Sequence, residues 1–87
     1  MIKGNDLRRL IELAFDYVSA ETEQQASQIY EQADILAIET TTFKTWLNLV
    51  GYIKEWNNNS ANKDPLSRAS AMQFFLTRQI ELQAARG

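Results

Sequence analysis

The sequence predicts a small all-α protein, a four-helix bundle-like domain that dimerisation could complete. Apolar residues recur at helical spacing in four segments, and no alternation typical of strands persists along the chain. At 87 residues the chain has the length of one domain, and a domain of this size buries only about 60% of the surface that its unfolded chain exposes. The composition, 45% hydrophobic and 23% charged, is typical of a globular protein.

The first two helices are expected over 6–20 and 23–38. Each has an apolar stripe on one side and charged residues on the other. Thr22 and Gln25 form a capping-box pattern at the start of the second helix, in which the threonine oxygen accepts from the first turn and the glutamine reaches back. This pattern predicts that the second helix begins directly after Thr22.

The third and fourth helices are expected over 43–56 and 65–84. Thr42 can cap the third helix, since threonine favours caps over helix interiors. Asp64 can cap the fourth, with Pro65 at its first position. The polar segment between them predicts a chain reversal, and the short connections predict that consecutive helices run roughly antiparallel.

The last two helices carry more apolar surface than a bundle this small needs. One face of the fourth helix holds Leu66, Ala69, Met72, Leu76 and Ile80, and a second face lies roughly 120° round. The second face, together with the aromatic edge of the third helix, forms the predicted partner-binding set. Its members are Tyr52, Trp56, Ala71, Phe74, Phe75, Arg78 and Leu82.

Three explanations of this surplus stay open at the level of sequence. The fourth helix could be central, with neighbours on both sides; the chain could form a homodimer; or the surplus could form a groove for a different protein. If the second face is an exposed patch, a charged residue in place of Phe75 should abolish association and leave the helical content intact. Ile35 and Ile38 fall outside the stripe of the second helix, so they are either core or contact residues.

No residue pattern in the sequence indicates catalysis. The chain has no cysteine and no histidine, which removes thiolate chemistry, the commonest general base and the usual transition-metal ligand. The carboxylate pairs Glu12 with Asp16 and Glu31 with Asp34 are interpreted as solvated helix charge. We therefore expect no enzyme activity, no cofactor and no metal site.

Charge is distributed unevenly along the chain. Residues 1–43 hold eight acidic side chains against three basic ones, and residues 44–87 hold six basic against three acidic. The favoured interpretation is attraction between helix pairs or between subunits. The alternative is a nucleic-acid-binding or transcription-associated module, in which basic side chains contact phosphates beside Tyr52 or Trp56. These bases would be Lys44, Lys54, Arg68 and Arg78.

The sequence thus predicts a non-enzymatic protein-interaction module, a regulator, adaptor or inhibitor that binds a protein partner or a second copy through apolar helical faces. A structural subunit of a larger assembly is a further alternative. We expect a cytoplasmic protein without a membrane partner, because residues 1–6 lack the apolar region of a signal peptide and the apolar run over 46–53 is too short to cross a bilayer.

Overall fold

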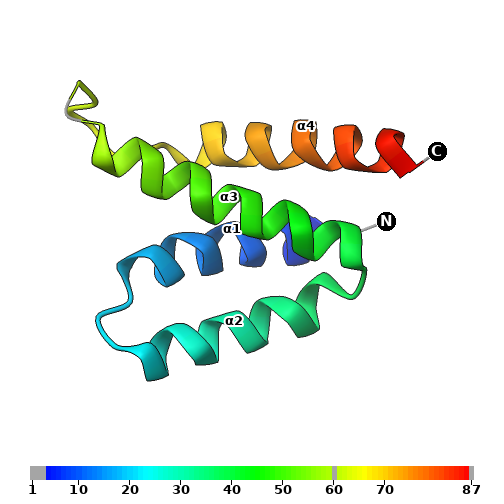
Figure 1. Ribbon diagram of the computed structural model, residues 1–87, viewed down its shortest axis with the longest axis horizontal. Coiled ribbons are helices and arrows are strands. Elements are labelled where there is room, and N and C mark those ends of the chain that lie inside the picture. The colour runs from blue at the N-terminus through cyan, green and yellow to red at the C-terminus, as the bar shows by residue number, and fades with distance from the viewer. Residues whose placement is uncertain (1–3, 60, 87) are drawn as a thin grey trace.

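Four helices make up most of the chain in the computed structural model, which describes residues 4–59 and 61–86. They are α1 (Gly4–Ser19), α2 (Glu23–Ala37), α3 (Thr40–Asn58) and α4 (Arg68–Arg86). The described residues contain no strand, which confirms the all-α prediction. Figure 1 shows α1 and α3 in the middle of the molecule, α2 on one side of them and α4 on the other, with consecutive helices running in opposite directions.

The start of α2 confirms the predicted capping box. Thr22 has extended backbone angles, and its Oγ1 accepts a hydrogen bond from the backbone N–H of Gln25 at 3.1 Å. The Gln25 side chain reaches back as expected, but it accepts from the N–H of Glu21 and not from that of Thr22. These bonds satisfy donors that a helix N-terminus otherwise leaves free.

The start of α3 differs from the prediction. The helix begins at Thr40, so Thr42 lies within its first turn and is buried instead of capping it. Thr45 is buried as well, and its hydroxyl donates to the Thr41 carbonyl at 2.8 Å. Packing of these threonines inside the protein outweighs their weak helix propensity. The helix therefore begins three residues earlier than predicted, at Thr40 instead of residue 43.

The start of α4 was also predicted wrongly. The helix begins at Arg68, and Ser67 caps it, since its Oγ accepts from the Ser70 N–H at 3.1 Å. The carbonyl of Asp64 accepts from the indole N–H of Trp56 at 2.8 Å, and Leu66 is buried. These two contacts hold the chain against α3 before the helix can start, so Asp64 and Pro65 belong to the connection.

The core is centred on Trp46 in α3. Its side chain is fully buried, and its indole N–H donates to the carbonyl of Leu10 in α1 at 2.9 Å. Phe43 stacks beside it at 5.8 Å between ring centroids, and the rings of Tyr17 and Tyr30 approach it edge-on at 5.6 and 6.3 Å. One tryptophan therefore joins α1, α2 and α3.

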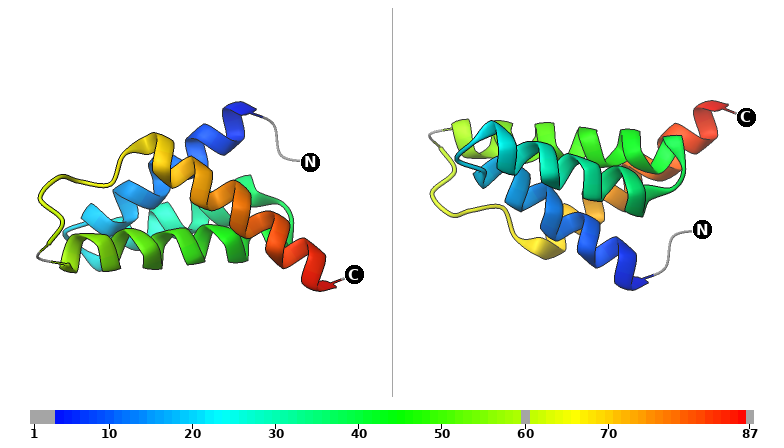
Figure 2. Two further views of the ribbon diagram at one scale, coloured as in Figure 1. Left: turned by 90° about the horizontal axis from the view of Figure 1, so that it is seen from above. Right: turned by 90° about the horizontal axis from the view of Figure 1, so that it is seen from below.

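Helix α4 completes the fold from outside this three-helix unit. It packs mainly along α3, and it meets α1 only near its own N-terminus. Figure 2 shows that α1 and α4 diverge from this crossing, so that the C-terminal part of α4 extends away from α1. One side of α4 is consequently left without a neighbouring helix over much of its length.

We expect Trp46→Ala to be among the most destabilising single substitutions in the chain. It removes a fully buried indole and leaves a cavity between three helices, which costs about 3–5 kcal/mol of unfolding free energy. Urea unfolding followed by circular dichroism measures this loss. Trp56→Ala is the matched control, because Trp56 is only half-buried and its loss should cost clearly less; equal losses would contradict a central role for Trp46.

Candidate functional site

Two members of the predicted partner-binding set belong to the core. Ala71 and Phe75 are both 0% exposed, in the hydrophobic cluster that also contains Trp46 and Ile53. The expectation that their side of α4 forms an exposed patch is therefore wrong. This side faces α3, and the large ring of Phe75 fills the space between the two helices.

The other members of the set are half-buried and have partners within the chain. Phe74 stacks on Tyr52 with ring centroids 4.3 Å apart and planes 9° apart, and Trp56 lies edge-on to Tyr52 at 6.5 Å. Arg78 pairs with Glu81 at 3.0 Å, and Leu82 lines a pocket together with Thr40 and Thr41 at the start of α3. The structure thus brings the set together, but as the seam between α3 and α4.

The other apolar face of α4, which lies outside the predicted partner-binding set, is the exposed one. Leu76 is 44% exposed and Ile80 is 67% exposed, while Met72 is half-buried and Ala69 is exposed. At 100° per residue these four share one side of the helix with four uncharged polar or small residues. We call this side the α4 face; it consists of Ala69, Met72, Gln73, Leu76, Thr77, Ile80, Gln83 and Ala84.

The α4 face borders a groove between α1 and α4. The groove is lined by Arg8, Ile11, Glu12, Arg68, Ala69 and Met72. The Arg68 side chain is held in place, because its Nε lies 2.9 Å from Glu12 and its guanidinium lies 3.8 Å from the centre of the Phe15 ring. This ion pair joins the acidic and basic halves of the chain. Both of its residues line the groove, so the pair forms one wall of it.

A second apolar surface lies at the turn between α2 and α3. Ile35 is 78% exposed and Ile38 is 85% exposed, so neither is a core residue. Ile38 has φ 64° and ψ −55°, and the N–H of Glu39 bonds back to the carbonyl of Ala37 at 2.6 Å. This is the rare γ-turn with positive φ, which a β-branched residue adopts only with strain. We call Ile35 and Ile38 the isoleucine tip.

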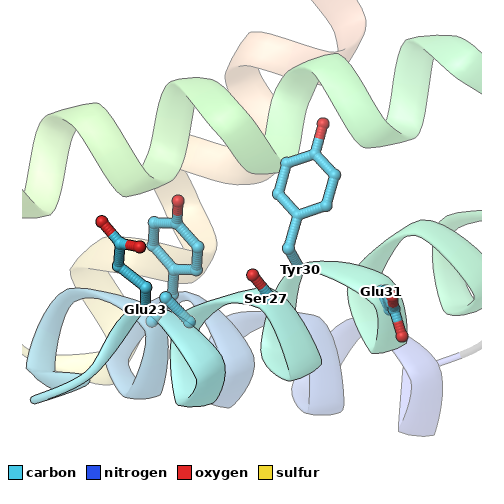
Figure 3. Close-up of a pocket in the computed structure, with 6 residues that line it drawn as sticks. Glu23, Ser27, Tyr30 and Glu31 are labelled. Carbon is cyan, nitrogen blue, oxygen red and sulfur yellow. The ribbon is translucent and has the colours of Figure 1, made fainter.

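A shallow pocket between α1 and α2 is lined by aromatic and acidic side chains. Figure 3 shows Glu23, Ser27 and Tyr30 pointing to the same side of α2, with the ring of Tyr30 directed toward α3. Tyr30 packs edge-on against Phe43 with ring centroids 5.1 Å apart, so its ring also contacts the aromatic cluster around Trp46. Within residues 4–59 and 61–86, no group of three acidic, histidine or cysteine side chains could hold a metal ion.

Three of the four cations proposed to contact phosphates are engaged by other side chains. Arg68 pairs with Glu12, Arg78 pairs with Glu81, and the Lys54 ammonium lies 5.6 Å from the centre of the Tyr17 ring. Each of these contacts competes with phosphate binding. Of the three contacts, the pair of Arg68 with Glu12 is the ion pair that joins the acidic half of the chain to the basic half.

Comparison with protein-family models, curated proteins and solved structures found no significant match to this chain. Among the described helices, none is long and apolar enough to span a membrane.

The neighbours Phe75 and Leu76 should respond oppositely to substitution. Phe75→Glu places a charge in the core and should unfold the protein, so that circular dichroism shows loss of helix. Leu76→Glu, one residue further along the same helix, should keep the fold within about 0.5 kcal/mol of unfolding free energy. A folded Phe75→Glu protein would contradict the assignment of these two faces.

Ile38→Gly should stabilise the fold. Removing the side chain relieves the strain of this γ-turn conformation, about 1–3 kcal/mol, and the added freedom of glycine in the unfolded chain offsets about 0.5–1 kcal/mol of that gain. The melting temperature should therefore rise by a few degrees in a thermal scan. Ile35→Gly is the control, since Ile35 lies within α2 and glycine there should lower the melting temperature.

Proposed function

We propose that the protein is a non-enzymatic interaction module that binds a helical protein segment on the α4 face. The observation that carries this proposal is a solvent-exposed helix side that holds Leu76 and Ile80 and no charged residue. Exposed apolar patches of this kind are typical of interaction sites, and depletion of charge is typical of the centre of an interface.

The spacing of the apolar residues suits a helix as the partner. Met72, Leu76 and Ile80 follow one another at intervals of four, which aligns them along one ridge of α4. A second amphipathic helix can lay its own apolar stripe against this ridge, as in helix-in-groove recognition. The adjacent groove between α1 and α4 extends the apolar surface toward Ile11 and gives it a charged border at Arg8.

Binding of this kind requires no catalytic group. Regulators, adaptors and inhibitors act through such contacts, and each of these roles is compatible with a chain that lacks histidine and cysteine. The proposal does not depend on the seam residues Tyr52 and Phe74, which stack on each other.

The experiment compares three immobilised baits in the same cell extract. In the Leu76→Glu/Ile80→Glu variant, two charges enter the α4 face, and loss of two apolar anchors should weaken capture of a specific protein by roughly 30-fold or more. The matched control is Ile35→Glu/Ile38→Glu, which adds the same charges to the isoleucine tip, an apolar surface that is even more exposed. The tip variant should capture the same protein as the wild type does.

Thermal unfolding is measured on both variants as a control, and it should show that each remains folded. Capture that is the same for the wild type and the α4 variant, or lost only in the tip variant, would contradict the proposal.

A further inference from the structure

We infer that the helical segment bound on the α4 face is α4 of a second copy of this chain, running antiparallel with Leu76 at the two-fold axis. The inference rests on the proposed function and names its partner. This face is a solvent-exposed and uncharged side of a described helix, and three of its properties favour self-pairing.

The first property is the symmetry of the spacing. Met72 lies four residues before Leu76 and Ile80 lies four residues after it. In a two-fold antiparallel pair, Leu76 therefore meets its own equivalent, and Met72 of each copy lies opposite Ile80 of the other. A symmetric dimer needs such a self-complementary surface, in which the contact that residue i makes with residue j is made a second time by j with i.

The second property is charge. A self-paired surface carries every one of its charges twice, so a face whose charges are all of one sign repels its own copy. The eight residues of the α4 face are all uncharged; Arg78 and Glu81 lie on other sides of the helix, and Arg68 borders the face, where it lines the groove beside Ala69 and Met72. Helix α2, by contrast, exposes Glu23, Glu31 and Asp34, so pairing through it would bring carboxylates together.

The third property is the length of α4 and the open space beside its C-terminal part. Helix α4 has 19 residues and thus spans about 28 Å, and Figure 2 shows that its C-terminal part extends away from α1. A helix of the other copy can therefore lie along the C-terminal part of the face without meeting α1, and α1 borders the face only at its other end, beside Ala69 and Met72. One helix pair lies at the small end of protein interfaces, so we expect weak association, with a Kd in the range of about 10 µM to about 1 mM.

The test uses the absence of cysteine from the chain, since every introduced thiol is unique. A disulfide forms only where two Cα atoms come within about 7 Å. Under mild oxidation Leu76→Cys should crosslink to itself and give a species of twice 10.0 kDa. Met72→Cys mixed with Ile80→Cys should crosslink to each other more than either does alone, because the helices are antiparallel.

Ile35→Cys is the control thiol, more exposed than Leu76 and outside the α4 face. Crosslinking of Ile35→Cys as fast as Leu76→Cys would show random collision and overturn the inference. Self-crosslinking of Met72→Cys and of Ile80→Cys, without crosslinking between them, would indicate parallel helices and overturn it as well.

Light scattering on the unmodified protein gives the second measurement. From about 10 µM to about 1 mM the mass should rise from 10.0 kDa toward twice that value, and Leu76→Glu should stay at 10.0 kDa throughout. A wild-type protein that stays monomeric overturns self-pairing. The proposed function still stands in that case if the α4 bait variant loses a captured protein that the tip variant keeps, and it fails with the inference if both baits behave alike.

Discussion

The hydrogen bond from the Trp46 indole to the Leu10 carbonyl is the constraint on which the packing of this protein depends. A buried indole N–H without an acceptor would be costly, so the tryptophan fixes α3 against one turn of α1. Phe43 and Tyr30 then pack around the same ring, which places α2. In a chain of 87 residues with a limited core, one large side chain in contact with three helices sets their relative positions.

The exposed α4 face follows from this arrangement. Because α1, α2 and α3 enclose Trp46, α4 can reach the core only along α3, through Phe75 and Ala71. Leu66 and the Trp56 bond to Asp64 fix where α4 starts, and the pair of Arg68 with Glu12 fixes its crossing with α1. Beyond that crossing the two helices diverge, and no described helix remains to cover Leu76 and Ile80 (Figure 1).

The sequence predicted the four helices because hydrophobic periodicity and the Thr22 cap are local signals. It did not predict which side of α4 is buried, since both sides are apolar on a helical wheel and only tertiary contacts distinguish them. Side-chain volume was a usable signal: the buried side holds Phe74 and Phe75, and aromatic rings contribute most to a small core. The start of α3 could not be predicted from the neighbouring residues either, because a threonine such as Thr42 is typical of a helix cap and its burial depends on tertiary contacts.

The acidic surroundings of the isoleucine tip disfavour pairing of two tips. The tip is more exposed than the α4 face, so hydrophobicity alone would favour pairing of tips. Asp34 and Glu39 stand next to Ile35 and Ile38 in sequence and are themselves exposed, so two paired tips would gather four carboxylates. Repulsion of this kind excludes one apolar contact without weakening another. The uncharged α4 face is free of such repulsion, which is why this face, and not the tip, is the surface proposed for self-pairing.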